Sequence, residues 1–598
     1  MFKHLGSLFP YLWRYRWRLL LGVCFTALSN LFGVFSPQVI REAINRTIAL
    51  VPHHAPYVPD PAFRKLFNLI GTGVLSFTLL ILAFAVLRGL FLFFMRQTLI
   101  VMSRYIEYDQ KADLYRHYQE LHLGFYKQNN TGDLMNRMTD DVSKVRMFTG
   151  PTLMYTINLL SLFVIVLYTM YRVNPMLTLF SVLPLPLMGL TIFLVNHIIE
   201  RKSEQIQQQL SALTTFVQES FSGIRLIKSY VQESQMLNFF SRETGLYKEK
   251  NLSLAKVESI YFPIIFLLVG LSNVLTIFVG GTLAIQGKIS PGNIAEFVLY
   301  INMLTWPIAS VGWVMALMQR AAASQKRINE FMHIPPAISS APGGLRTQLQ
   351  GAISFRQVSF SYPDTGITAL KNVSFDLQPG QKLAVIGRVG SGKSTLAQLL
   401  VRAYEASAGE ILLDNQPIQS YALKTLRGQI GYVPQDVFLF SDTVRHNIGF
   451  GLDHPVNSEL EAAAGGASVA AEILRLPLGY DSVIGERGVT LSGGQKQRIS
   501  LARALAKKPP ILLLDDCLSA VDAHTEQQIL QHLGTELENR TAIIITHRIF
   551  SLLHFDQIVV LDDGEVVENG THEALMAGKG AYYNLYQLQQ LEGAANEN

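Results

Sequence analysis

The chain is poor in charged residues. Asp, Glu, Lys and Arg make up only 16% of its 598 residues, against 49% for hydrophobic residues. A soluble protein averages roughly 25% charged residues. The deficit is concentrated in six charge-free runs: Leu19–Ile40, Leu66–Leu87, Met147–Tyr171, Val173–Ile199, Ser259–Gly287 and Phe297–Gln319. Each exceeds the roughly 20 residues that a helix needs to cross a bilayer. The scarcity excludes a wholly soluble protein and predicts an all-α N-terminal region of six membrane-spanning helices, followed by a soluble region.

Cysteine is also scarce. The two cysteines are Cys24, in the first apolar run, and Cys517, far along the soluble region. Residues so placed cannot pair, so a disulfide framework is excluded. The first apolar run is also longer than the roughly 7–15 residues of a signal-peptide core, so we expect it to be a true span and not a cleaved leader.

The formal net charge of +5 invites comparison with nucleic-acid-binding proteins, but the positions of Lys and Arg argue against that class. Basic residues precede the first run and cluster between runs two and three and between runs four and five, whereas the other three connections contain few. Such an asymmetry is the positive-inside pattern of membrane proteins. It predicts a multi-pass protein of the cytoplasmic membrane with both termini in the cytoplasm and no nucleic-acid partner.

The sequence divides into four expected segments. Residues 1–18 mix aromatic and basic side chains and predict an amphipathic elbow helix at the membrane interface. Residues 19–332 form the expected transmembrane domain, with two long, helix-compatible cytoplasmic extensions that reverse near 124–132 and 222–229. A Pro/Gly/Ser-rich linker follows at 333–351, and the expected soluble domain covers 352–598.

Two arginines follow the charge-free part of the second run. Arg88 ends that run and Arg96 lies two helical turns further on. Ionisable side chains near a bilayer are costly and are candidates for function. If the helix continues, however, both are expected near or beyond the inner headgroups, where a side chain can extend to water. We therefore favour this explanation over substrate contact, which stays the alternative.

The soluble region begins with alternating and apolar segments that predict an α/β domain. Phe355–Phe360 alternates like a strand, and Lys382–Ile386 is a short apolar strand. The second strand leads directly into Gly387-Arg-Val-Gly-Ser-Gly-Lys-Ser394, and a helical pattern follows to Arg402. Strand, glycine-rich turn and helix are the context of a P-loop, whose backbone N–H groups surround phosphate.

The chemistry of this loop predicts ATP and Mg²⁺ as ligands. Its glycines allow the backbone to approach the phosphates, Lys393 would reach the β- and γ-phosphates, and the Ser394 hydroxyl would bind Mg²⁺. The helix N-terminus adds a favourable dipole. The expected nucleotide-binding residues of the loop are Gly387, Gly390, Gly392, Lys393, Ser394 and Thr395.

Two further motifs indicate which kind of ATP-binding protein this chain resembles. Leu491-Ser-Gly-Gly-Gln495 lies about a hundred residues after the loop, and Ile511-Leu-Leu-Leu-Asp-Asp516 follows it closely. Together with Tyr362, Gln435 and His547, these motifs make the whole chain resemble the ATP-binding cassette transporters. Six spans ahead of one ATP-binding domain resemble a half-transporter of the exporter type, called type IV. The two reversal points then resemble the coupling helices of that family.

The resemblance implies a role for each matching residue. Tyr362 would stack on adenine, Gln435 would contact Mg²⁺, and Asp515 would be the carboxylate on the magnesium side. His547 would sense the γ-phosphate and Asp522 would cross the dimer interface. The residues that would close over ATP held by a second subunit are Ser492, Gly493, Gly494 and Gln495.

Asp516 departs from the family pattern. In the family a glutamate at this position polarises the attacking water. Aspartate keeps the charge but withdraws the carboxylate by about one C–C bond, on the order of 1.5 Å, and a misplacement of about 1 Å can cost ~10²-fold in rate. We therefore expect this chain's own site to bind ATP well and to hydrolyse it slowly.

The resemblance implies ATP-driven export of a hydrophobic or amphipathic small molecule, either a drug or a lipid. The slow site and the intact Leu491–Gln495 motif resemble one half of a heterodimeric multidrug exporter, in which the second half-transporter supplies the competent site. Two alternatives stay open: a homodimeric lipid flippase with two slow sites, and an ATP-gated channel or regulatory subunit.

Overall fold

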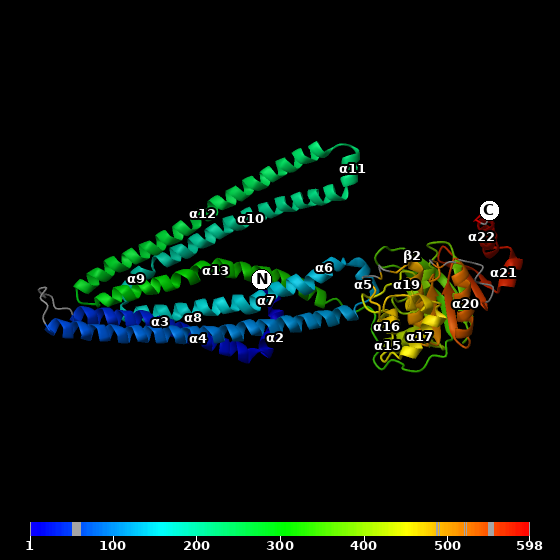
Figure 1. The fold of residues 1–598 in the computed structure, drawn as a ribbon, viewed down its shortest axis with the longest axis horizontal. Coiled ribbons are helices and arrows are strands. Elements are labelled where there is room, and N and C mark those ends of the chain that lie inside the picture. Colours follow the sequence, from blue (N-terminus) through cyan, green and yellow to red (C-terminus); the bar gives the residue numbers. More distant parts are fainter. Residues whose placement is uncertain are drawn as a thin grey trace. The chain divides into compact units, whose positions relative to one another are not determined.

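The computed structural model describes residues 2–50, 61–485, 488, 491–519, 521, 523–547 and 555–596. Asp522 lies outside these residues. The chain forms two compact units (Figure 1). The N-terminal unit comprises Met1–Arg116 and Gly132–Ile334, and the C-terminal unit comprises His117–Thr131 and Pro335–Asn598. A short piece from the first half of the chain thus packs with the C-terminal unit.

The N-terminal unit is all helical. In the part of the chain that the structure describes, six helical segments are long and apolar enough to cross a membrane: Arg16–Ala49, Gly73–Glu120, Thr131–Val173, Pro175–Ser222, Glu233–Ile285 and Pro291–Met332. The expected number of spans is confirmed. The main helices are α3 (Arg16–Leu50), α4 (Pro61–Glu120), α6 (Thr131–Asn136), α7 (Val142–Met147), α8 (Leu153–Val173), α9 (Pro175–Val182), α10 (Pro184–Ser222), α12 (Glu233–Ile285) and α13 (Pro291–Met332). Two π-helical stretches, η2 (Arg137–Asp141) and η3 (Phe148–Thr152), join α6, α7 and α8.

Two tight turns are closed by helix caps. The Asn174 side chain accepts a hydrogen bond of 3.0 Å from the Leu177 N–H, and Pro175 opens α9 with its fixed φ. Ser290 and Asn293 form a capping box around Pro291 at the start of α13. The polar and proline residues between apolar runs therefore end one helix and start the next.

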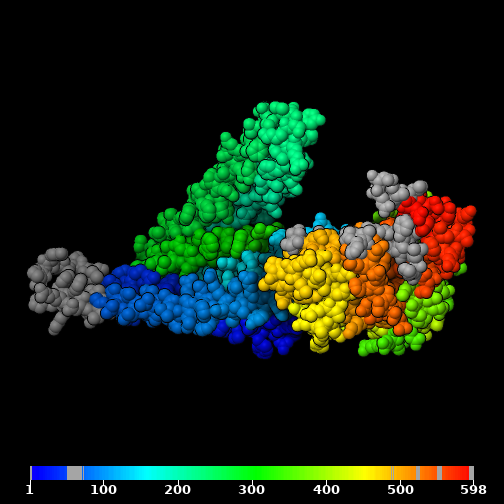
Figure 2. All heavy atoms as spheres, turned by 45° about the vertical axis from the view of Figure 1, so that its right-hand side comes forward, coloured from blue at the N-terminus to red at the C-terminus, as the bar shows by residue number. Residues whose placement is uncertain are grey.

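The two long helical extensions reverse at short helices. α5 (Leu123–Gln128) lies between α4 and α6, and α11 (Ile224–Ser229) lies between α10 and α12. α10 and α12 pair along their length to form a hairpin with α11 at its tip (Figure 1), and Figure 2 shows it as a ridge of the N-terminal unit. Lys250 Nζ on α12 donates to Gln209 Oε1 on α10 at 2.9 Å, which joins the two helices.

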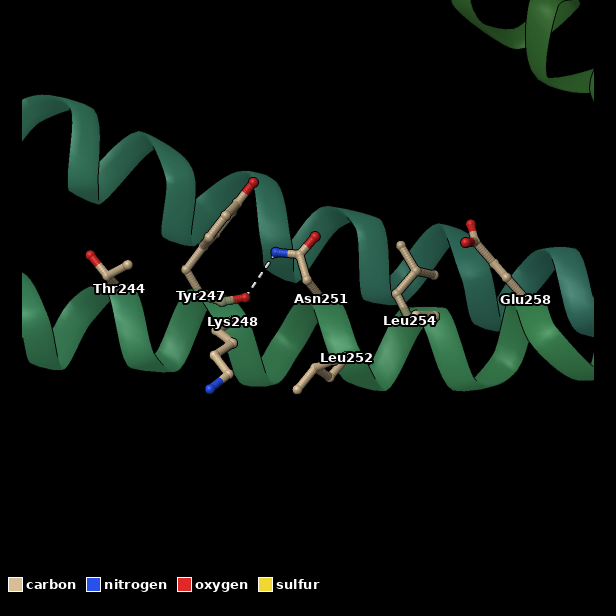
Figure 3. Close-up of a pocket in the computed structure, with 8 residues that line it drawn as sticks. Thr244, Tyr247, Lys248, Asn251, Leu252, Leu254 and Glu258 are labelled. Atoms are coloured by element: carbon tan, nitrogen blue, oxygen red, sulfur yellow. Dashed lines mark hydrogen bonds between the residues drawn. The ribbon is translucent and has the colours of Figure 1, made fainter.

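One shallow groove follows the N-terminal half of α12. It has a volume of about 430 Å³, and the residues that line it all belong to α12. Figure 3 shows Lys248 and Leu252 projecting away from α10, while Asn251 Nδ2 donates to the Tyr247 carbonyl at 2.8 Å within the helix. A hollow with one helical wall is an open surface and not an enclosed cavity.

The first residues form short helical turns and not one continuous elbow helix. α1 (Phe2–Leu5), a 3₁₀ turn η1 (Gly6–Leu8) and α2 (Phe9–Arg14) precede α3. Trp13 and Trp17 are 57% and 69% exposed, and the Arg16 guanidinium lies over both rings. Exposed indoles beside a cation suit the interface between headgroups and hydrocarbon.

A buried ion pair joins α3 to α13 at the end of the spans nearest the 287–291 turn. Arg41 Nη1 lies 3.1 Å from Glu296 Oε2, and the Glu296 side chain is fully buried. Asn293 Nδ2 and the Tyr300 hydroxyl also donate to this carboxylate, at 3.1 and 3.0 Å. Asn45 extends the contact because its Oδ1 accepts from the Gly292 N–H at 2.9 Å. A charge buried in this way is stable only because several donors surround it.

The C-terminal unit has the predicted α/β architecture. Its described residues contain a four-stranded antiparallel sheet in the order β2-β1-β4-β5 and a six-stranded sheet in the order β10-β9-β3-β8-β7-β6. In the second sheet only β10 runs antiparallel to its neighbour. The strands are β1 (Ile353–Ser361), β2 (Thr368–Leu377), β3 (Lys382–Gly387), β4 (Ala408–Leu413), β5 (Gln416–Pro417), β6 (Ile430–Val433), β7 (Ile511–Asp515), β8 (Thr541–Ile545), β9 (Gln557–Asp562) and β10 (Glu565–Gly570).

Helices cover the parallel sheet and bring its strand ends together. The central strands β3, β7 and β8 are almost wholly buried, as expected for parallel strands with both faces covered. The helices of this unit are α14 (Lys393–Leu400), α15 (Leu423–Gly428), α16 (Val444–Gly449), α17 (Asn457–Gly466), α18 (Ala470–Leu474), α19 (Gly493–Ala506), α20 (Ala523–Glu536), α21 (His572–Gly578) and α22 (Ala581–Asn596). The loops after parallel strands gather at one sheet edge, where ligands of such folds bind.

Candidate nucleotide-binding site

The glycine loop connects β3 to α14, as predicted. Gly387 has a φ of +155°, and a Cβ there would lie 2.0 Å from the Leu561 carbonyl oxygen. Gly392 has a φ of +96°, and a Cβ there would lie 2.2 Å from the Ala369 carbonyl oxygen. Both positions therefore require glycine. Gly390, with a φ of +85°, faces open space on the loop.

Lys393 extends its ammonium group under this loop. Its Nζ donates to the carbonyl oxygens of Gly387 at 2.8 Å and Arg388 at 2.7 Å. The side chain is 6% exposed, and this burial lowers the pKa of Lys393, while Asp516 and Asp515 oppose the shift. A cation held among backbone carbonyls at a helix N-terminus is placed to bind phosphate oxygens.

Ser394 and Asp515 meet across the site. The Ser394 hydroxyl donates to Asp515 Oδ1 at 3.1 Å, which joins the start of α14 to the end of β7. Burial raises the pKa of Asp515, and the neighbouring Asp516 adds to the rise, while Ser394 and Lys393 oppose it. A hydroxyl and a carboxylate are the hard oxygen ligands that Mg²⁺ prefers, so this pair fits that ion.

Two predicted residues approach the carboxylate of Asp516. Gln435 Nε2 lies 3.4 Å and His547 Nε2 lies 4.0 Å from its Oδ2 atom. The Asp516 backbone has a φ of +48°, and its N–H donates to the Ile545 carbonyl at 2.9 Å. The carboxylate, which is only 9% exposed, is therefore fixed by the ends of β7 and β8.

Tyr362 follows β1 and lies next to the loop. Its hydroxyl shares a hydrogen bond of 2.8 Å with Thr395 Oγ1, and its ring packs edge-on against Tyr404. Lys127 Nζ on α5 lies 4.9 Å from the centre of the Tyr362 ring. Sequence reasoning missed Lys127, because no local pattern relates a lysine of α5 to an aromatic residue so far along the chain.

The Ser492–Gln495 motif begins α19. The Ser492 hydroxyl accepts from the Gln495 N–H at 3.2 Å, and Gln495 Oε1 accepts from the Ser492 N–H at 2.9 Å. This capping box leaves the N–H groups of Gly493 and Gly494 at the positive end of the helix dipole. Glu472 accepts from Gln495 Nε2 at 3.0 Å and pairs with Arg498 at 2.6 Å, which fixes the motif against α18.

A contact with the C-terminal helix was not predicted. Gln589 Nε2 on α22 donates to the backbone carbonyl of His547. α22 is itself held at its start, where the Glu568 carboxylate accepts from the N–H groups of Ala581 and Tyr582 at 2.7 and 2.9 Å. The loop that carries His547 is therefore supported by a helix from the end of the chain.

The arrangement is that of a P-loop ATP-binding domain, and the comparisons with known proteins identify its family. The profile of the ABC transporter transmembrane region matches residues 19–308, and the ABC transporter profile matches residues 370–519. The chain is 38% identical over 468 residues to the probable multidrug resistance ABC transporter ATP-binding/permease protein YheI of Bacillus subtilis, which covers 78% of this chain and 80% of the relative.

Two other relatives and one solved structure also align over most of the chain. The multidrug resistance-like ATP-binding protein MdlA of Escherichia coli is 36% identical over 503 residues, 84% of this chain and 85% of the relative. The ATP-dependent lipid A-core flippase of Syntrophus aciditrophicus is 33% identical over 490 residues, 82% of this chain and 81% of the relative. A bacterial Atm1-family ABC exporter solved with ATP bound has a TM-score of 0.76 at 25% identity, covering 96% of this chain and 98% of the other.

The chain belongs to the ABC transporters and has the type IV exporter fold. It is a multi-pass membrane protein that binds ATP and couples its hydrolysis to export, as a half-transporter that works in a dimer.

Proposed function

We propose that this chain is the slow-site half of a heterodimeric exporter that moves a hydrophobic or amphipathic small molecule out of the cytoplasm. One observation carries the proposal: Asp516 stands where the family has glutamate, and its backbone is held by β7 and β8. The strand ends cannot move forward to replace the missing methylene. The carboxylate therefore lies on the order of 1.5 Å short of the catalytic position, which can cost ~10²-fold or more in rate.

ATP binding is retained in this proposal. Lys393 and the loop amides would hold the phosphates, Ser394, Gln435 and Asp515 would hold Mg²⁺, and Tyr362 would stack on adenine. None of these roles needs the carboxylate of residue 516. ATP would therefore persist in this site and keep the two ATP-binding domains together while the second site turns over.

Hydrolysis is assigned to the site that the partner subunit's loop completes with this chain's Ser492, Gly493 and Gly494. The capping box at Ser492 supports this assignment because it directs the N–H groups of the following glycines outward from the start of α19. Phosphoryl transfer depends on positioning and charge stabilisation, so amides placed against the γ-phosphate contribute directly to the rate.

The orientation and the substrate complete the proposal. The excess of Lys and Arg in 102–146 and 200–256 supports a cytoplasmic location for these extensions and both termini. Two of the relatives named above are multidrug proteins, which supports a drug-like substrate. The flippase among them supports a lipid as the second candidate, with the chain as a homodimer.

The test replaces Asp516 with glutamate in the dimer of this chain with its native partner, reconstituted in liposomes. ATP turnover per dimer should rise, because a second site becomes competent. Asp516→Asn is the matched control: it keeps the length of the side chain, removes the base, and should leave turnover unchanged. Brisk hydrolysis by this chain without a partner would overturn the proposal.

A further inference from the structure

An unassigned cavity, open on one side, lies between three helices of the N-terminal unit. It has a volume of about 630 Å³ and is bounded by α4, α13 and the segment that leads from α7 into α8. Ligand pockets for drug-sized molecules occupy roughly 300–1,000 Å³. The lining residues used below are Phe93, Arg96, Gln97, Met154, Tyr155 and Trp313.

Most of the wall is apolar and aromatic. The Tyr155 and Trp313 rings meet edge to face, with centroids 5.3 Å apart, and Phe93 contributes a third ring that is 56% exposed. Met154 supplies a flexible thioether beside them. Aromatic rings and methionine adapt to varied apolar bodies without fixing one shape.

One formal charge lines this cavity among the residues that the structure describes. Arg96 projects from α4 with Gln97 beside it, and within the described chain its guanidinium has no hydrogen bond or ion pair. A planar guanidinium binds carboxylate or phosphate through two parallel hydrogen bonds, and Gln97 can donate a third.

Arg88, two turns earlier on the same helix, is placed differently. Its guanidinium lies against α3, where a Cβ added to Gly33 would be 3.3 Å from the Arg88 Cζ atom. Arg88 therefore covers a neighbouring helix, whereas Arg96 faces the cavity. The two arginines, equivalent in the sequence, have separate surroundings in the fold.

We propose that this cavity binds the anionic head and apolar body of an amphiphilic substrate, with Arg96 as the residue that selects the negative charge. The inference rests on the proposed export function and names its substrate class. Arg96 lies nine residues beyond Leu87, or about 13 Å along the helix at 1.5 Å per residue. A guanidinium past the end of the apolar run lies toward the polar side of the span, where it can meet the head of an amphiphile whose tail stays in the hydrocarbon.

The experiment measures binding to the dimer in nanodiscs of neutral phosphatidylcholine, without nucleotide. The probes are a matched pair, dodecyl phosphate and dodecyltrimethylammonium, which share a tail and differ in the sign of the head. Wild-type protein should bind the phosphate at least about tenfold more tightly, because charge-assisted hydrogen bonds contribute about 1.5–3 kcal/mol. Omitting nucleotide separates this test from the question of which ATP site is slow.

Three variants locate the charge. Arg96→Ala should remove the preference, and Arg96→Glu should reverse it. Arg104→Ala is the control, since Arg104 lies on the same helix, is paired with Glu107 at 3.0 Å and does not line the cavity. Thermal unfolding of each variant verifies its fold, and a reversed preference in Arg96→Glu cannot arise from misfolding.

A second arm identifies the source of the anion. Nanodiscs that contain phosphatidylglycerol offer a resident anionic lipid as competitor. Undiminished dodecyl phosphate binding would support a transported amphiphile, whereas competitive loss that depends on Arg96 would support an anionic lipid in the same site. Equal binding of the two probes to wild-type protein, or unchanged selectivity in Arg96→Ala, would overturn the proposal.

Discussion

The His547 Nε2 atom and the Asp516 Oδ2 atom lie 4.0 Å apart. That separation exceeds the roughly 2.7–3.2 Å of a hydrogen bond. A glutamate, longer by on the order of 1.5 Å, could bring the carboxylate within hydrogen-bond distance of the histidine. The site thus contains a carboxylate and a histidine that face each other without direct contact, as expected if the missing methylene has separated them.

We first predict unequal effects of two substitutions in this chain. Ser492→Arg should abolish most of the turnover of the dimer, by ~10²-fold or more, because it disrupts the amides that serve the competent site. Lys393→Met should reduce ATP turnover much less, because Lys393 belongs to the slow site. The measurement is steady-state ATP hydrolysis by the purified dimer with its native partner.

Lys371→Met is the matched control for the lysine substitution. Its Nζ pairs with the 91% exposed Asp563 at 2.7 Å, so an effect on turnover is not expected. If Lys393→Met were the more damaging change and Ser492→Arg were tolerated, the assignment of the competent site to the partner's loop would be wrong.

Our second prediction concerns the buried carboxylate of Asp515. Burial raises its pKa above the ordinary value of 3.8, so the folded state holds its proton more tightly than the unfolded state does. Stability therefore falls as pH rises through the folded pKa, and the penalty is fully present above that pKa. Asp515→Asn should raise the melting temperature of nucleotide-free protein, by about 2–4 °C for each kcal/mol regained.

The same variant should lose the stabilisation that Mg²⁺ with ATP gives to the wild type, because the amide cannot replace a charged ligand of the ion. Thermal unfolding from pH 5 to pH 8, with and without Mg²⁺ and ATP, measures both effects. The difference in melting temperature between nucleotide-free wild type and nucleotide-free Asp515→Asn should become smaller as the pH falls toward 5. A destabilised apo variant at neutral pH would contradict the argument.

The third prediction addresses the Arg41–Glu296 pair. Glu296→Gln leaves the arginine without its counter-ion in a protein interior and should cost on the order of 2–3 kcal/mol, because removal of one partner of a buried pair is expensive. This cost is lower than the roughly 3–5 kcal/mol expected when both side chains are fully buried, because the Arg41 side chain is 30% exposed. Unfolding in detergent micelles, followed by circular dichroism, measures the loss.

Arg46→Gln is the comparison for that loss. Arg46 pairs with Glu42 at 2.8 Å, but both side chains are exposed, so the expected cost is within about 0.5 kcal/mol. Equal effects of the two substitutions would show that the buried pair does not hold α3 to α13.

Much of the fold could be predicted because its signals are local. Charge-free runs identified the spans, and glycine with flanking apolar strands identified the P-loop and its helix. The predicted strand Lys382–Ile386 differs from β3 by one residue. The predicted helix from Ser394 to Arg402 extends past the end of α14 at Leu400, since Arg402 adopts a φ of +52° that ends a helix.

What could not be predicted depends on residues distant in sequence. No pattern within residues 1–18 showed that the elbow would break into three turns. Lys127 reaches the Tyr362 ring only because α5 packs with the C-terminal unit. The same limit applies to Arg96, which periodicity could not distinguish from Arg88. Only the fold shows that Arg96 lines the cavity and that Arg88 lies against Gly33 of α3.

The hydrogen bond from Gln589 to the His547 carbonyl has a practical consequence. An affinity tag or fluorescent protein fused after α22 would be attached to the helix that holds the histidine loop in place. We therefore expect such a fusion to alter the rate of ATP hydrolysis that is measured. The dependence is also useful: a small dye on the outer face of α22 would change brightness with each rearrangement of that loop, and would time ATP turnover in single molecules.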